Sequence, residues 1–396
     1  MDTVTLLDEL QKRAWRDPAI RNRLLDTRKA ADTLSAFCRE CRKLGYEIYE
    51  MELICAGEEF HAAMKRSTNG GGENSPMLTD EDDFYELFMA SLERKSERNG
   101  ESMHSINDCY TLNDGARIPV QGFGTYKVVG HDNVQILKTA IRCGYRFFDT
   151  ASLYETERSL GQALKESGLP REDFVIETKL WIPERGYENA KRALEASLSR
   201  LQTDYVDLYL IHWPRQTGAW DENWKEINAE TWRALEEMRA EGKIRSIGCS
   251  NFLPHHLISL LENCKVKPAV NQLELHPGHS QEAAVRFCLD HDIRPMAWSP
   301  LGRRCDSQDA DRYLLNPLAE KYGKSPAQIS LRFLTQKGII PIPKASSEAH
   351  MKGNQDIFDF TLTEEEMWMI SCMPQTTWQG EHPDFCIPSK EMNPDQ

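Results

Sequence analysis

From about residue 106 onward, the chain alternates short runs of β-branched and aromatic residues with amphipathic stretches of helical periodicity. Some runs are apolar throughout, as expected when both faces of a parallel strand are buried. Eight strands, each followed by a helix, predict a closed (β/α)8 barrel, an α/β fold known as the TIM barrel. The predicted strands are 122–127, 146–151, 174–180, 206–213, 246–251, 269–275, 295–300 and 339–343, and the helical segments between them include 133–143, 155–168, 188–201 and 230–242.

Residues 1–66 differ from the rest because they show helical periodicity and no strand signal. Asp17-Pro18 is an N-cap followed by proline at the first helical position, and Asp32 marks the start of another helix that Gly45 ends. The predicted division of the chain is a small all-α N-terminal domain over 1–66, a glycine-rich and acidic linker with a short helix over 67–105, the barrel over 106–380 and a tail over 381–396.

Cys38 and Cys41 form a Cys-x-x-Cys pair on the apolar face of the second of these helices. A zinc site needs a second Cys or His pair at a matching spacing, and none follows, so buried core cysteines are favoured. With Gly45-Tyr46 and a downstream Gly70-Gly71, the segment resembles the Nif11-type domain, known mainly as a leader for modified peptides. The resemblance leaves two roles open for residues 1–104: binding a protein or peptide partner, or stabilising the barrel.

The composition narrows the classes of partner. A net charge of −14 argues against nucleic acid, because neutralising phosphates requires a basic surface. No apolar run approaches the length of a membrane span, and the first residues lack the plan of a signal peptide. The 11 cysteines, an odd number in a large acidic chain, indicate reduced thiols. We therefore expect a cytoplasmic protein that binds neither nucleic acid nor membrane.

Polar residues gather where the predicted strands end. Asp149, Lys179 and His212 come at the ends of three successive strands, and Tyr154 follows the first of these at the expected start of a helix. Each has an ordinary structural interpretation when taken alone, as a helix cap, a snorkelling lysine, a hydrogen-bonded histidine or a packing residue. Since chemistry in such barrels lies at the carboxyl ends of the strands, their convergence predicts one active site.

Over about residues 106–375, the sequence motifs resemble those of the aldo-keto reductase superfamily and follow one another in the same order along the chain. The motifs are Gly122-Phe123-Gly124-Thr125-Tyr126, Phe148-Asp149-Thr150-Ala151-Ser152-Leu153-Tyr154, Thr178-Lys179-Leu180-Trp181, Ile211-His212-Trp213-Pro214, Ile247-Gly248-Cys249-Ser250-Asn251-Phe252, Asn271-Gln272, Ser299-Pro300-Leu301-Gly302 and Ile342-Pro343-Lys344. The resemblance implies an NAD(P)H-dependent oxidoreductase that reduces aldehydes or ketones to alcohols.

The resemblance also implies the role of each catalytic residue. Tyr154 would be the general acid that protonates the carbonyl oxygen. Lys179 would lower the pKa of Tyr154, and Asp149 would hold Lys179 in place. His212 would orient the carbonyl and donate a hydrogen bond to it. The substrate contacts would be Tyr126, His212, Trp181 and Trp213.

Cofactor contacts follow in the same way, with NADPH as the implied cofactor and Trp298 stacked on the nicotinamide. Where the family usually has an arginine, this chain has His350, which weakens discrimination and makes NADH use an open alternative. The full set implied is Thr125, Tyr126, Asp149, Ser250, Asn251, Gln272, Trp298, Ser299, Leu301, Lys344, Ser346, Ser347, His350 and Asn354.

Other classes of site receive less support. Gly122-x-Gly124 is no Rossmann fingerprint, since Lys127 stands at the third glycine's place. No Cys or His cluster has metal spacing, so no metal is expected. Two alternatives to a small-carbonyl reductase stay open: an NADPH-sensing regulatory or docking module that works through the N-terminal domain, and a reductase of a peptide-borne carbonyl.

Overall fold

The computed structural model describes residues 3–30, 32–54, 85, 88, 89, 92, 103–128, 133–215, 222–302, 311–375, 378 and 380–385. The chain divides into two compact units, Met1–Ser102 and Met103–Gln396. Each unit has its own hydrophobic core, so the two are treated separately below.

The first unit is helical, as the sequence predicted. Its helices are α1 (Thr3–Arg16), α2 (Pro18–Asp26), the short 3₁₀ helix η1 (Thr27–Lys29) and α3 (Thr33–Lys43). The carboxylate of Asp17 caps α2 by accepting hydrogen bonds from the N–H groups of Ala19 and Ile20, and Asp32 caps α3 through Ser35 N–H at 3.0 Å. Gly45, with φ of +92°, follows the end of α3, a backbone conformation that glycine tolerates.

The core of this unit confirms the interpretation of the cysteine pair. Phe37, Cys38 and Cys41 are fully buried on one face of α3. Burial raises the pKa of Cys38 to about 11, so the thiol stays protonated and packs as a small apolar group. The same core includes four side chains from the segment expected to be a linker: Tyr85, Phe88, Met89 and Leu92.

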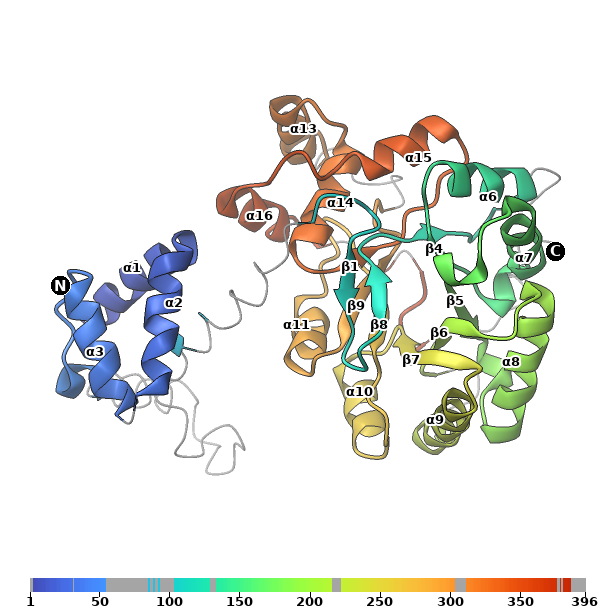
Figure 1. Ribbon diagram of the computed structural model, residues 1–396, viewed down its shortest axis with the longest axis horizontal. Coiled ribbons are helices and arrows are strands. Elements are labelled where there is room, and N and C mark those ends of the chain that lie inside the picture. The colour runs from blue at the N-terminus through green and yellow to red at the C-terminus, as the bar shows by residue number, and fades with distance from the viewer. Residues whose placement is uncertain are drawn as a thin grey trace. The chain divides into compact units, whose positions relative to one another are not determined.

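The second unit is the (β/α)8 barrel that the sequence predicted (Figure 1). Every neighbouring pair of strands in its sheet is parallel. The strands are β3 (Phe123–Gly124), β4 (Phe147–Asp149), β5 (Val175–Leu180), β6 (Val206–Ile211), β7 (Ile244–Ser250), β8 (Val270–Glu274), β9 (Arg294–Trp298) and β10 (Ile340–Pro341).

Helices surround the sheet (Figure 1). They are α6 (Asn133–Arg142), α7 (Glu157–Ser167), α8 (Tyr187–Leu201), α9 (Trp224–Ala240), α10 (Pro254–Leu261), α11 (Glu282–Asp290), α13 (Asn316–Tyr322), α14 (Pro326–Gln336), α15 (Glu348–Gln355) and α16 (Glu364–Ser371). Short turns of helix connect them at η2 (Ser152–Tyr154), η3 (Arg171–Asp173), η4 (Ile182–Glu184) and η5 (Asp311–Leu315). No helix in the described ranges is both long and apolar enough to cross a membrane.

Hydrogen bonds between the first and last strands close the barrel. The N–H of Gly122 donates to the carbonyl oxygen of Pro341 at 3.0 Å, and that of Gly124 donates to Pro343 at 3.1 Å. A Cβ at Gly124 would lie 3.1 Å from the main-chain carbonyl oxygen of Ile342, a tighter contact than is usual, so glycine suits the close approach of the two strands. The antiparallel hairpin of β1 (Cys109–Thr111) and β2 (Arg117–Pro119) precedes the barrel.

Strand β6 shows why some predicted strands are apolar throughout. Leu208 and Leu210 belong to one hydrophobic cluster, which includes Met296 of β9. Tyr209 and Ile211 belong to a second cluster, which includes residues of the surrounding helices. Because side chains alternate along a strand, β6 is buried on both faces, against the barrel interior and against the helical layer.

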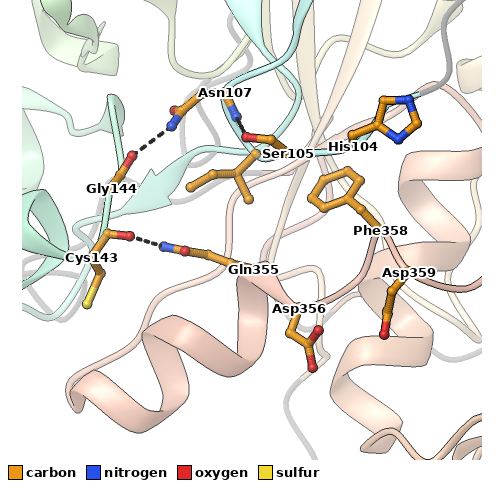
Figure 2. Close-up of a pocket in the computed structure, with 10 residues that line it drawn as sticks. His104, Ser105, Asn107, Cys143, Gly144, Gln355, Asp356, Phe358 and Asp359 are labelled. Atoms are coloured by element: carbon orange, nitrogen blue, oxygen red, sulfur yellow. Dashed lines mark hydrogen bonds between the residues drawn. The ribbon is translucent and has the colours of Figure 1, made fainter.

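A pocket of about 360 Å³ lies at the amino ends of the strands, where the chain enters this unit (Figure 2). Figure 2 shows Asn107 and Gln355 reaching across it to the main-chain carbonyl oxygens of Gly144 and Cys143, each at 2.9 Å. Its carboxylates, Asp356 and Asp359, each lie 2.8 Å from the ammonium of Lys324. The pocket therefore lies at the end of the barrel opposite to the carboxyl ends of the strands, and hydrogen bonds cross it.

Candidate active site

The catalytic candidates lie at the carboxyl ends of three adjacent strands. Asp149 is the last residue of β4, Lys179 is the penultimate residue of β5, and His212 directly follows β6. Tyr154 ends η2 rather than starting the helix expected over 155–168, because Glu155 takes a left-handed conformation before α7 begins. Parallel pairing places these strand ends on one rim, which brings the four side chains together.

Lys179 is fully buried and forms an ion pair with the carboxylate of Asp149. Its ammonium also donates a hydrogen bond to the carbonyl oxygen of Thr150 at 3.0 Å. Burial alone would lower the pKa of this lysine, but Asp149 and Tyr154 outweigh burial and raise it above its ordinary value. Lys179 is therefore a fixed cation inside the barrel.

The phenol of Tyr154 lies between this cation and His212. Its oxygen is 3.4 Å from His212 Nε2, and the ammonium of Lys179 is 5.0 Å from the centre of its ring. Burial raises the pKa of Tyr154 above its ordinary value, while Lys179 acts in the opposite direction. Lys179 therefore lowers the pKa of Tyr154, as expected from the sequence, but burial outweighs the lysine and the net shift is upward. Tyr154 keeps its proton at neutral pH.

His212 is buried and neutral. Burial, followed by the positive charge of Lys179, holds its pKa well below the ordinary value. Its Nδ1 has no hydrogen-bond partner among the residues that the structure describes, and its Nε2 faces Tyr154, so the tautomer with the proton on Nε2 presents an N–H donor to the site. The rings of Trp181 and Trp213 lie 5.2 and 6.5 Å from the imidazole. An N–H donor and aromatic walls therefore meet at the phenol.

The structure brings a second group of expected residues together beside this cluster. The amide of Asn251 donates to the carbonyl oxygen of His212 at 3.0 Å and accepts from the indole N–H of Trp298 at 2.8 Å. Asn251 has a φ of +62°, a left-handed conformation that asparagine adopts more readily than most residues. The hydroxyl of Ser250 donates to the main-chain carbonyl oxygen of Gln272 at 3.0 Å. These contacts fix Ser250, Asn251, Gln272 and Trp298 around one rim.

The residues expected near the cofactor's phosphates lie further out. Lys344, Ser346 and His350 are exposed, and the hydroxyl of Ser347 caps α15 by accepting a hydrogen bond from the N–H of His350 at 3.3 Å. Ser299, with φ of +51°, and Leu301 are half-buried in the turn after β9.

Two expected cofactor contacts are buried. Thr125 is fully buried, and its hydroxyl hydrogen-bonds to that of Thr156 at 2.8 Å. Asn354 is buried, and its main-chain carbonyl oxygen accepts a hydrogen bond from the side-chain amide of Gln121 at 3.1 Å. Tyr126, by contrast, lies at the site, with its ring centre 4.9 Å from that of Tyr154.

Sequence reasoning missed one member of the site, Glu177. It lies two residues before Lys179 in β5, is fully buried, and has a carboxyl oxygen 3.6 Å from the lysine ammonium. The signal was present, because alternation along a strand places residues two apart on the same face. A charged residue in an apolar strand, on the face of a buried lysine, points into the barrel interior.

Three potential metal ligands meet outside this cluster, at His255, His256 and Asp384. His256 Nδ1 accepts a hydrogen bond from the N–H of Leu253 at 3.1 Å, so the neutral ring carries its proton on Nε2 and donates it to Asp384 at 2.9 Å. Burial lowers the pKa of His256, which keeps the ring neutral. The guanidinium of Arg215 also lies 3.5 Å from Asp384. The group is therefore a hydrogen-bonded clamp rather than a metal site.

This clamp holds the described end of the chain across the barrel. The N–H of Gly380 donates to the carboxylate of Glu274 at 3.2 Å, and a Cβ at Gly380 would lie 2.7 Å from the indole of Trp298. Trp378 packs edge-on against His279 with the ring centres 4.7 Å apart. Trp378 and Gly380, at the end of the range predicted for the barrel, thus contact the strand ends, while Asp384 of the expected tail contacts α10 and Arg215. Residues 386–396 lie outside the described residues.

Comparison with known proteins identifies the family. Residues 122–372 match the model of the Aldo/keto reductase family. The 9,11-endoperoxide prostaglandin H2 reductase of Trypanosoma cruzi is 41% identical over 290 residues, 73% of this chain and 99% of that protein. The glyoxal reductase of Bacillus subtilis is 42% identical over 281 residues, 71% of this chain and 98% of its own. A solved aldo-keto reductase of Bombyx mori in complex with NADP is 36% identical, with a TM-score of 0.61, covering 66% of this chain and 91% of its own.

The fold and the site define a (β/α)8 barrel whose strand ends enclose a phenol, a buried ion pair and an imidazole. With the matches to relatives over nearly their whole lengths, the family is clear: the chain belongs to the aldo/keto reductase family. The family model begins at residue 122, so it does not include the N-terminal unit. The resemblance of that unit to a Nif11-type domain stays a prediction.

Proposed function

We propose that the barrel reduces small aldehydes or ketones to alcohols with NADPH, and that Tyr154 is the general acid. The observation that carries the proposal is the position of the Tyr154 hydroxyl, 3.4 Å from His212 Nε2 and beside the buried pair of Lys179 and Asp149. A protonated phenol next to a fixed cation and a neutral N–H donor is suited to protonating a carbonyl oxygen.

The residues around the rim fit a nicotinamide dinucleotide. Polar side chains of Ser250, Asn251 and Gln272 lie next to the half-buried indole of Trp298, which offers hydrogen bonds and an aromatic surface for a carboxamide-bearing ring. Lys344 and the hydroxyls of Ser346 and Ser347 offer a cation and hydrogen-bond donors at the start of α15, which favours bound phosphate. The solved Bombyx mori relative contains NADP. These features support NADPH, with NADH as the alternative.

The proposed mechanism assigns one task to each side chain. When bound, the reduced nicotinamide supplies the hydride for the carbonyl carbon. His212 Nε2–H donates a hydrogen bond to the carbonyl oxygen and orients it toward Tyr154. Tyr154 then transfers its phenolic proton to that oxygen, and the cation of Lys179 stabilises the phenolate that forms. Asp149 keeps Lys179 charged and in place.

The aromatic rings of Tyr126, Trp181 and Trp213 surround the phenol and the imidazole, and we propose that they line the substrate pocket. The relative from Bacillus subtilis is a glyoxal reductase. Glyoxal and other small reactive aldehydes are therefore the first substrates to test.

Replacing Tyr154 with phenylalanine tests the proposal. Tyr154→Phe removes the transferable proton and keeps the ring, so we expect kcat for glyoxal to fall by about 10²–10⁴-fold while NADPH still binds. NADPH oxidation and equilibrium dialysis measure the two effects. A wild-type protein that binds NADPH but reduces no aldehyde, or a variant that keeps its rate, would contradict the assignment.

A second candidate is a regulatory or docking module in which the barrel senses NADPH and the N-terminal unit contacts a partner, and a related one is a reductase whose carbonyl is carried by a peptide bound to that unit. The separate hydrophobic core of that unit favours this possibility. It predicts that removal of the unit abolishes partner binding and leaves NADPH binding intact. A cytoplasmic location remains part of the proposal.

A further inference from the structure

The barrel interior beneath the proposed catalytic residues holds two carboxyl groups beside the single ammonium of Lys179. Asp149 and Glu177 lie on adjacent strands with their Cα atoms in register, and both carboxyl groups approach Lys179. All three side chains are buried, and Glu177 and Lys179 are fully so. One ammonium and two ionised carboxylates would leave a net negative charge in a low-dielectric interior, which is costly.

The hydrogen bonds around Glu177 show which carboxyl group holds a proton. Its Oε2 receives no hydrogen bond from the residues that the structure describes, whereas the carboxylate of Asp149 accepts from both Lys179 and Gln272. Ionising Glu177 would place a second negative charge in the buried site and leave one of its oxygens without a donor, which costs more than keeping the carboxyl group neutral. Burial, followed by the charge of Asp149, raises the pKa of Glu177 well above its ordinary value of 4.5. Glu177 is therefore a neutral acid in the folded protein.

The amide of Gln272 connects this acid to the proposed cofactor site. Gln272 Nε2 donates to Asp149 Oδ2 at 3.0 Å and to Glu177 Oε1 at 2.5 Å. A side-chain amide has two N–H donors, so these two acceptors use both of them. Of the side-chain amide, only the oxygen Oε1 is then left for another partner. Without Glu177, one N–H would lack its acceptor and the amide would be free to turn.

We propose that Glu177 is a positioning residue for the proposed reductase: a proton-bearing acid that, with Asp149, occupies both N–H groups of Gln272 and so presents its carbonyl oxygen to the NH₂ group of the nicotinamide carboxamide. This inference rests on the proposed function, because it assumes that the nicotinamide binds beside Gln272. It assigns a role to a residue that takes no direct part in the proposed proton transfer.

The test compares two ligands by calorimetry on the full-length protein. NADPH contains the nicotinamide, whereas adenosine 2′,5′-bisphosphate contains the adenine and the 2′-phosphate but no nicotinamide. For Glu177→Leu, which fills the space without an acceptor, we expect NADPH affinity to fall by about tenfold. Affinity for the bisphosphate should stay within about twofold of wild type. A purely structural role would weaken both ligands together.

Glu177→Gln serves as the rescue variant, because glutamine matches the size of a protonated glutamate and keeps an acceptor oxygen for Gln272. It should bind NADPH within about twofold of wild type. If Glu177→Leu does not fold, Glu177→Asp, whose shorter side chain draws the acceptor back from Gln272, should show the same ligand-dependent loss.

The matched control is Glu157→Gln. Glu157 is also buried and hydrogen-bonded, to Thr178 and Arg200, but it lies on α7, outside the barrel interior. This variant should bind both ligands as wild type does.

The outcomes separate the inference from the proposed function. If wild type binds no NADPH, both fail. If wild type binds NADPH and Glu177→Leu binds it equally well, or loses both ligands in parallel, the inference fails and the proposed function stands. If Glu177→Gln loses as much NADPH affinity as Glu177→Leu, Glu177 acts through a negative charge, and the proton-bearing role is wrong.

Discussion

The site depends on how buried charges are balanced residue by residue. Lys179 is paired with Asp149, His212 is neutral, and Tyr154 and Glu177 have raised pKa values. Burial is the first cause of each of these three shifts and favours the neutral form each time. The ion pair of Lys179 and Asp149 therefore lies among three neutral side chains, each of which carries a proton that can form a hydrogen bond.

The raised pKa of Glu177 gives the stability of the protein a specific dependence on pH. A group whose folded-state pKa exceeds its unfolded value of 4.5 contributes stability below that pH and loses it as the pH rises. Glu177→Gln has no such proton, so its stability relative to wild type should increase above pH 4.5, by up to about 1.4 kcal/mol per pH unit. Denaturant titrations between pH 5 and pH 8 measure this difference, and a constant difference would show that Glu177 is ionised.

Coenzyme preference is a second property at the scale of single residues. His350 is exposed one turn into α15, near Lys344 in sequence and on the side where we place the 2′-phosphate. His350→Arg adds a permanent charge with several donors, so NADPH affinity should rise by roughly fivefold while NADH affinity stays the same. Comparing the two dissociation constants checks this. An equal change for both coenzymes would place His350 away from the phosphate.

At the scale of helices and strands, the close approach of α7 to α8 depends on one glycine. A Cβ at Gly161 would lie 2.3 Å from the carbonyl oxygen of Leu201, so Gly161→Ala must push the helices apart. We expect a loss of about 1–3 kcal/mol in unfolding free energy. Gly353→Ala, on α15 with open space around it, is the matched control and should be neutral or stabilising. Urea unfolding of both variants measures the contrast; equal effects would contradict it.

The sequence predicted all eight barrel strands, but β3, β4 and β10 are half the predicted length or less. In β10 and just after it, Pro341 and Pro343 have no N–H to donate, which limits the ladder that 339–343 can form with its neighbours. Helix α9 begins at Trp224, six residues before the predicted start at 230. There the buried Asn228, which donates to Pro214 and accepts from Arg185, interrupts the apolar periodicity that marks a helix.

Asp149, Lys179 and His212 could be predicted because each stands at a strand end, where barrel topology determines the neighbours. Tyr154 could be predicted because it follows the end of β4 by only five residues. Glu177 and the clamp of His255, His256 and Asp384 could not be found as readily. Asp384 lies about 130 residues from its partners, 128 from His256 and 129 from His255, in a segment without strand or helix periodicity. Contacts of that kind depend on the path of a loop, for which a single sequence gives no periodic signal.

For the whole molecule, the two separate cores lead to a prediction about truncation. Relatives of 41–42% identity match about 71–73% of this chain over 98–99% of their own lengths, so a barrel without the N-terminal unit corresponds to a complete relative. Residues 103–396 alone should therefore fold and keep the kinetic constants of the full chain. Circular dichroism and NADPH oxidation test this, and an insoluble or inactive barrel would assign the N-terminal unit a structural role.

The tryptophans at the mouth of the barrel have one more consequence. Trp298 is held by Asn251, and Trp181 and Trp213 flank His212, so three indoles surround the place where we expect cofactor and substrate to meet. The fluorescence of these tryptophans depends on the polarity of their surroundings and on energy transfer to a bound dihydronicotinamide. Binding of the cofactor should therefore change the protein's own fluorescence. Replacing Trp298 alone should show which part of that change is caused by the nicotinamide.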